Sequence, residues 1–170
     1  MDEIINKVDQ SGIITLDLIK YKPRDDEFEV FDVVPFLLHG YLLQEKVFRA
    51  EMAQTNWSLY KDKDIIIYCS NDAIVPYWAY VFISSLLQPY ARTIIYAADH
   101  QDHQHLLWME KIRAIDYTIY KGKKVVLKAS SEVAPEMFVI ATKPLMTQVQ
   151  TLMWGEAGSP LMIYKQKKTT

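Results

Sequence analysis

Two short polar segments carry most of the side chains that could do chemistry. The first is Cys69-Ser70-Asn71-Asp72 and the second is Ser130-Ser131-Glu132; each follows an apolar run and precedes a proline. Polar residues where a strand gives way to a helix are typical of ligand sites in open α/β sheets. The same short side chains also satisfy turn and cap N–H groups. Both roles stay open, and these residues are the candidate ligand-binding set.

Neither polar segment contains glycine, so neither is a P-loop or a dinucleotide-binding fingerprint. The start of a helix nearby still suits a small anionic ligand, because its free N–H groups carry partial positive charge. No cofactor is predicted.

Enzyme chemistry is an alternative use of the same residues. Cys69 precedes a predicted helix N-terminus, a position that can activate a thiol as a nucleophile. No histidine lies near it in the sequence, and Ala129 takes the matching place in the second segment, which favours a buried, inert cysteine. In a second version of the enzyme hypothesis, Asp72 and Glu132 act as general acid and base. The catalytic residues stay unassigned.

A histidine-rich run, residues 99–105, has the residue types of a metal site. On a helix, His100 and His103 share a face because they are three residues apart. A closed zinc site needs four ligands, and a solvated first helical turn with Asp99 as its N-cap accounts for the same residues. Metal binding through His100, His103 and His105 is the weaker alternative, and no metal ligand is assigned.

Alternating apolar runs and amphipathic segments position these side chains. Ile65–Cys69 is a continuous apolar run, as expected of a parallel strand covered on both faces. Pro76–Gln88 predicts a helix, with proline at its tolerated first position. Further strands are expected at 93–97, 124–127, 151–154 and 161–164, and further helices at 99–117 and 135–148. This alternation predicts an α/β fold with a mainly parallel or mixed sheet.

The chain is predicted to contain an internal duplication. Residues 65–72 align with residues 125–132, strand on strand, serine on serine and acid on acid. Deleting one residue places Pro76 on Pro135, and deleting one more aligns the strands that follow. Any two βαβ units resemble each other, but prolines and acids in register favour duplication. It would bring both polar segments to one edge of the sheet.

A single domain, residues 1–170, is expected from the chain length. Its N-terminal α+β addition, 1–60, would hold a helix at 2–10, a hairpin of Ile13–Leu18 with Phe28–Phe31, and a helix at 45–54. The other predicted parts are a first βαβ unit at 61–98, a connecting helix at 99–122, and a second βαβ unit with a last strand at 123–170.

The helix predicted at Pro76–Gln88 carries no charged residue. Apolar residues all round a helix require cover on more than one side. A small sheet covers one side, so a second copy of the chain is the predicted cover for the other. The sequence thus predicts a homodimer, with Trp78, Tyr80 and Phe82 as interface residues.

Composition excludes some partners. The formal net charge of −2 gives no basic surface for nucleic acid. No apolar run approaches the roughly 18 residues of a membrane span, and the first residues lack a signal-peptide pattern. A single cysteine allows no internal disulfide, which fits a reducing cytoplasm.

Three segments resemble a small bacterial family catalogued only as a domain of unknown function, DUF2480. They are Ser11–Leu18, Cys69–Tyr80, and Gly155-Glu156 followed by Tyr164-Lys165. The resemblance covers nearly the full length and implies one cytoplasmic α/β domain with no assigned activity. The family's C-terminal turn carries a cysteine, whereas residues 155–160 here do not, which disfavours a two-cysteine metal or redox site.

Together these observations favour a homodimeric small-ligand or interaction module in the cytoplasm, with its site at the polar segments. The alternatives are an enzyme acting on a small anionic or carbonyl substrate through Cys69 or Asp72 and Glu132, and the histidine metal site.

Overall fold

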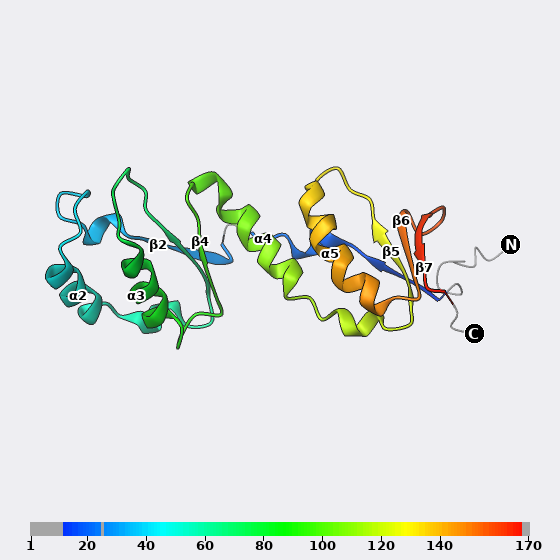
Figure 1. Ribbon diagram of the computed structural model, residues 1–170, viewed down its shortest axis with the longest axis horizontal. Helices are drawn as coiled ribbons and strands as arrows, with labels where there is room; N and C mark the ends of the chain where they lie inside the picture. Colours follow the sequence, from blue (N-terminus) through cyan, green and yellow to red (C-terminus); the bar gives the residue numbers. More distant parts are fainter. Residues whose placement is uncertain (1–11, 25, 168–170) are drawn as a thin grey trace, which may run out of the picture. The chain divides into compact units, whose positions relative to one another are not determined.

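The computed structural model describes residues 12–24 and 26–167 (Figure 1), so the predicted helix at 2–10 lies outside the described residues. The chain gathers into two compact units. Residues 23–107 form one, the continuous unit; residues 1–22 and 108–170 form the other, the split unit. Each has its own sheet and its own hydrophobic core, where the sequence led us to expect one sheet.

The continuous unit is built on a parallel sheet with strand order β2-β3-β4. Its strands are β2 (Phe28–Asp32), β3 (Asp64–Tyr68) and β4 (Thr93–Tyr96), and its helices are α2 (Glu45–Gln54) and α3 (Tyr77–Leu87). Three 3-10 turns complete it: η2 (Val34–Phe36), η3 (Trp57–Tyr60) and η4 (His100–Asp102). In Figure 1, α3 lies between α2 and the strands β2 and β4.

The central strand β3 is buried on both faces, as its apolar run predicts. Ile65 and Ile67 face the core shared with Phe48 of α2 and Ile83 of α3, and Ile66 is fully buried on the opposite face. Continuous burial of this kind is what parallel strands require.

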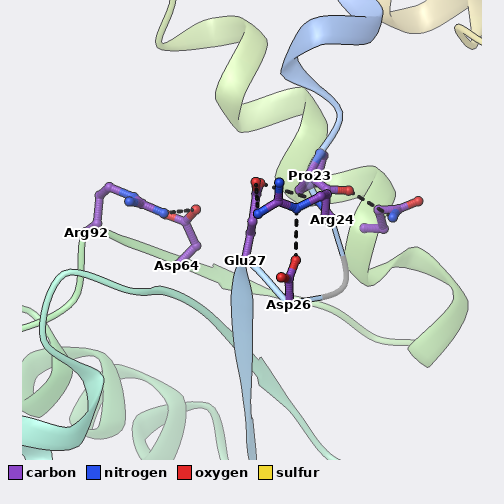
Figure 2. A network of polar contacts seen from close by, with 7 residues as sticks. Pro23, Arg24, Asp26, Glu27, Asp64 and Arg92 are labelled. Carbon is purple, nitrogen blue, oxygen red and sulfur yellow. Dashed lines mark hydrogen bonds and ion pairs between the residues drawn. The ribbon is translucent and has the colours of Figure 1, made fainter.

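The amino edge of this sheet is held by charge (Figure 2). Arg92, just before β4, donates two hydrogen bonds to the buried carboxylate of Asp64, at 2.8 and 2.6 Å. Arg24 lies beside Asp26 at the surface, at 3.0 Å. The Asp64 pair fixes the start of β3 against the start of β4, where a lone buried carboxylate would be costly.

The split unit has a sheet of order β1-β5-β6-β7, parallel except for its last strand. The strands are β1 (Ile13–Leu16), β5 (Lys124–Lys128), β6 (Thr151–Gly155) and β7 (Leu161–Lys165). With them belong α5 (Pro135–Gln148), η1 (Leu18–Tyr21) and η5 (Tyr117–Tyr120). The division between the units falls within α4 (His103–Arg113).

The two units follow the same plan. Each has a strand, a 3-10 turn, a helix, a second 3-10 turn, a central strand, a helix and a third strand, and each orders these strands 1-2-3 in parallel. In the split unit, residues 23–107 interrupt this plan between η1 and the second half of α4.

Matching backbone hydrogen bonds recur in both units. Arg92 N donates to Lys63 O and Gln150 N to Lys123 O, both at 2.8 Å. The turn before each central strand contains one residue in the left-handed region, Asp62 at φ 59° and Gly122 at φ 69°. The two units thus repeat the same local hydrogen bonds and turn geometry, and the duplication itself stays a prediction.

The predicted alignment of the helices is out of register by one residue. Pro76 and Ala134 both occupy the N-cap, so Pro76 matches Ala134 and not Pro135. Two aromatic pairs agree with the alignment of Pro76 on Ala134. Tyr80 meets Tyr96 edge to face, and Phe138, at the matching position of α5, meets Trp154 in the same way. Both deletions therefore lie before the helix.

The predicted N-terminal hairpin is wrong. Ile13 of β1 pairs in parallel with Lys124 of β5, and Phe28 of β2 pairs in parallel with Asp64 of β3, so the two strands belong to different sheets. The charged turn between them resembles a hairpin loop in composition, but a parallel neighbour from later in the chain satisfies each strand instead. The predicted helix at 45–54 is confirmed as α2.

Candidate functional site

The carboxyl edge of the β2-β3-β4 sheet gathers the first polar segment around a residue that the sequence analysis missed. Asp32, the last residue of β2, lies beside Tyr68 at the end of β3. Its carboxylate accepts three hydrogen bonds: from Ser70 Oγ at 2.5 Å, from Ser70 N at 3.1 Å and from Val34 N at 3.1 Å. Asp32 thereby fixes the chain as it leaves β3.

Asn71 has a structural role as well. Its Nδ2 donates to Gly40 O at 3.1 Å, and its Oδ1 accepts from Asp72 N at 3.0 Å. A short parallel bridge between Leu42 and Ile74 continues the same contact. The segment is thus fastened to the loop before α2, and the amide of Asn71 is engaged within the fold.

Cys69 is half-buried beside the core of the continuous unit. Its Sγ donates to the carbonyl oxygen of Asn71 at 3.3 Å. A thiol directed at a carbonyl, without a basic side chain bonded to it, is not prepared as a nucleophile. This geometry favours the inert cysteine.

The second polar segment has a simpler arrangement in the split unit. Ser130 Oγ accepts from Glu132 N at 3.2 Å, a local turn bond, and Ser131 is exposed. Asp17, which follows β1 as Asp32 ends β2, accepts from Ile19 N and from Lys128 Nζ, at 3.3 and 2.9 Å. The hydrogen bond to Asp17 raises the pKa of Lys128.

The two polar segments follow the central strands of separate sheets. The expectation that they share one edge of one sheet is therefore wrong, because it assumed that β3 and β5 belong to the same sheet. Asp72 and Glu132 likewise fall in different units and form no acid–base pair within either one.

A hollow of about 360 Å³ lies at the start of α3, next to the end of β4. It is lined by Tyr77, Tyr80 and Tyr96, and we call it the tyrosine pocket. The rings of Tyr80 and Tyr96 meet edge to face with centroids 5.1 Å apart. Burial, reinforced by the neighbouring Tyr96 and Cys69 and by a hydrogen bond with Tyr96, raises the pKa of Tyr80 to about 12, so its phenol is protonated at neutral pH.

The predicted interface residues are largely used inside the continuous unit. Trp78 meets Phe48 of α2 edge to face, and the guanidinium of Arg49 lies over the rings of Trp78 and Phe82 at 5.0 and 4.8 Å. Tyr80 packs on Tyr96. The outward stripe of α3 consists instead of Tyr77 and Val81, continued by Ile74 before the helix.

The histidine run forms η4, with Asp99 as its N-cap, and the first residues of α4. The rings of His100 and His103 lie 4.8 Å apart. Across residues 12–24 and 26–167, no group of three or more His, Cys, Asp or Glu side chains is placed to hold a metal ion. The geometry gives the metal alternative no support.

Asp32, Asp17 and Tyr96 are the residues that sequence reasoning missed. Both aspartates directly follow or end an apolar strand and bond the N–H two residues later, which is a recognisable Asx turn. That signal identifies the turn but not the partner strand. Tyr96 carries no signal beyond its place at the end of a predicted strand.

Fold and site together define an α/β protein of two like parallel units with a tyrosine-lined hollow at one sheet edge. The chain belongs to the family described as Protein of unknown function (DUF2480), whose profile matches residues 2–166. No curated protein and no solved structure shows significant similarity to it. In the part of the chain that the structure describes, no helix is both long and apolar enough to cross a membrane.

Proposed function

We propose that the chain is a small-ligand-binding module and that the tyrosine pocket of the continuous unit is its site. The observation that carries this is the hollow itself, which brings three phenols from α3 and β4 together where parallel sheets commonly bind ligands. The polar segment after β3 precedes the same helix, and hydrogen bonds to Asp32 and Gly40 hold this segment in place.

The lining favours a small planar carboxylate. None of the described residues that line the pocket is acidic, and the phenol of Tyr80 stays protonated. The N-cap of α3, Pro76, offers no side-chain hydrogen bond. Ala79 N donates to Pro76 O, so the N–H groups of Tyr77 and Trp78 are the ones that can attract an anion at this helix start. Aromatic rings add stacking surface for a flat molecule.

Titration with benzoate, followed by NMR, tests the proposal. Benzoate is expected to bind and to shift the ring signals of Tyr80 and Tyr96, and benzamide, which has the same shape without the charge, to bind more weakly. Tyr80→Phe removes one hydrogen bond to a charged acceptor and should weaken benzoate binding by at least tenfold. Tyr90→Phe, a control at an exposed site away from the pocket, should not. Equal binding by both variants would rule the pocket out.

An enzyme that uses Cys69 is the less favoured function. The expected result is that Cys69 reacts with a thiol reagent at neutral pH no faster than free cysteine, because its Sγ is half-buried and bonded to Asn71 O. Faster reaction than that of free cysteine in the same buffer would support Cys69 as a catalytic nucleophile.

Self-association is part of the proposal. Ile74, Tyr77 and Val81 are 91%, 88% and 69% exposed and lie along one line of the continuous unit, which is a surface suited to a second copy of the chain. The single cysteine supports a cytoplasmic location for such a dimer.

Light scattering at micromolar concentration tests the dimer, for which twice the chain mass is expected. Val81→Lys should convert the dimer to a monomer without lowering the melting temperature. Val139→Lys, at the matching exposed position of α5, is the control and should leave the mass unchanged. A monomeric wild-type chain would contradict the proposal.

A further inference from the structure

A second hollow of about 400 Å³ lies on the other face of the β2-β3-β4 sheet. We call it the histidine hollow. Its lining comes from β2 and from the beginning of α4 with the turn before it: Phe28, Val30, His100, Gln101, His103 and Gln104. Phe28 and Val30 are two residues apart and share a face, whereas Phe31 points into the core with α2 and α3. The histidine hollow is thus separate from the tyrosine pocket and its core.

His103 is the unusual member of this lining. Its side chain belongs to a residue that is only 3% exposed, and its Nε2 atom is buried with no hydrogen-bond partner. A buried polar atom left unbonded is a cost that folded proteins rarely carry. An unbonded buried atom on a residue that lines a hollow indicates a place where a ligand could supply the bond once the side chain moves enough to expose it.

Neighbouring rings hold the imidazole of His103 in place. The ring of Tyr68, at the end of β3, meets it edge to face with centroids 4.8 Å apart, and the His100 ring lies 4.8 Å away on the other side. Gln104 is also fixed, because its Nε2 donates to Pro23 O at 2.9 Å. Contacts within the fold thus order both side chains.

Charge around the hollow disfavours an anion. Burial, and then the nearby His100, lower the pKa of His103, so its imidazole is neutral at pH 7. Asp99 and Asp102 stand close enough to raise this pKa, and none of the described residues that line the hollow is Lys or Arg. A neutral ligand fits a neutral imidazole, amide side chains and apolar walls.

We propose that the histidine hollow binds a small neutral molecule with a flat apolar body and a hydroxyl group that hydrogen-bonds Nε2 of His103. Phe28 and Val30 provide the walls for the apolar body. A hydroxyl both donates and accepts, so it satisfies Nε2 whichever ring nitrogen of the neutral imidazole carries the proton. A metal ion is a poorer occupant, because the described residues supply no third ligand.

Phenol and toluene are the probes that test the proposal, since they have the same shape and differ in the hydroxyl. The chain has four histidines, so their ring signals are readily followed by NMR at pH 7.5. Phenol is expected to shift the His103 ring signals and to bind about tenfold more tightly than toluene, the ratio given by one buried hydrogen bond. The signals of exposed His39 should stay unchanged.

Three variants test whether phenol and toluene bind in the histidine hollow. His103→Phe keeps a ring beside Tyr68 but removes the nitrogen, so phenol should lose its advantage over toluene. Val30→Trp fills the hollow from its solvent side and should abolish binding of both probes, whereas Val47→Trp, the same change on the exposed side of α2, should not. Val30 and Val47 are exposed, so these two variants stay informative if His103→Phe fails to fold.

Equal affinity for phenol and toluene, or unchanged phenol binding in Val30→Trp, would overturn the proposal. Tyr80→Phe separates this site from the tyrosine pocket: the His103 shifts should persist in that variant. Loss of those shifts in Tyr80→Phe would mean that phenol acts from the tyrosine pocket, which would also refute the histidine hollow as its site.

Discussion

Asp32 does the most to shape the carboxyl edge of the continuous unit. Its carboxylate accepts from Val34 N and from both polar groups of Ser70, so it bonds the end of β2 to the segment after β3. The first polar segment is ordered by this carboxylate and by Gly40 O. Side chains that looked available for a ligand are therefore engaged within the fold.

Asp32→Ala should lower the free energy of unfolding by about 1–3 kcal/mol, since it leaves several donors without their acceptor. Urea denaturation measures the change. Asp26→Ala is the matched control, because Asp26 and its partner Arg24 are both largely exposed, and it should have little effect. Equal effects of the two substitutions would contradict the role given to Asp32.

Acid should weaken the continuous unit through His103. Its pKa is lowered in the fold, first by burial and then by His100, against the partial opposition of Asp102 and Asp99. The unfolded chain therefore binds the proton more readily than the folded one, so stability is full above the unfolded value of 6.5 and falls as the pH drops below it.

Urea midpoints measured from pH 7.5 down to pH 5 should show this loss, and His103→Phe should flatten the slope. A slope in His103→Phe as steep as that of the wild type would assign the loss to other groups.

At the scale of elements, an ion pair between Arg92 and Asp64 holds the start of β3 (Figure 2). Arg92 bonds the buried carboxylate of Asp64 with two nitrogens, whereas Lys63 and Glu29, 3.0 Å apart, are both about half exposed. Arg92→Ala should therefore cost about 2 kcal/mol in the free energy of unfolding. Lys63→Ala should change it little, and thermal melts of both variants give the comparison.

Element type was predictable where apolar runs were long. The strands at Ile65–Cys69 and Thr93–Ala97 and the helix at Pro76–Gln88 are confirmed within a residue or two as β3, β4 and α3. The sequence also shows that α3 carries no charged residue, but it does not show which residues pack over its apolar side chains. The guanidinium of Arg49, from α2, covers the rings of Trp78 and Phe82. The sequence pattern of α3 cannot reveal a covering residue that comes from another helix.

At the scale of the whole molecule, strand pairing was the part that sequence could not supply. β1 pairs with β5, and β2 pairs with β3, although long stretches of chain separate the partners. Adjacency in sequence had suggested a hairpin of β1 with β2. Apolar runs specify that a strand exists and carry little information about which parallel neighbour it takes. For the same reason, Ser70 and Asn71 could be singled out as candidates but their partners Asp32 and Gly40 could not.

A fragment of residues 23–107 should fold by itself, because these residues form a compact unit with its own sheet and core. Circular dichroism and a dispersed NMR spectrum would show it. The control is a fragment of residues 108–167, which lacks β1 and with it one neighbour of the central strand β5. It should be less stable than the same fragment supplied with residues 12–22 as a peptide.

The interruption of the split unit affects how the chain emerges from the ribosome. Residues 23–107 can acquire their structure as soon as they leave the exit tunnel, since everything they need is already made. The short strand at Ile13–Leu16, although translated first, must wait for Lys124–Lys128 before it has a neighbour. At about 5–20 residues per second, the apolar side chains of this strand stay unpaired for several seconds during synthesis. During that time they are exposed and can bind chaperones.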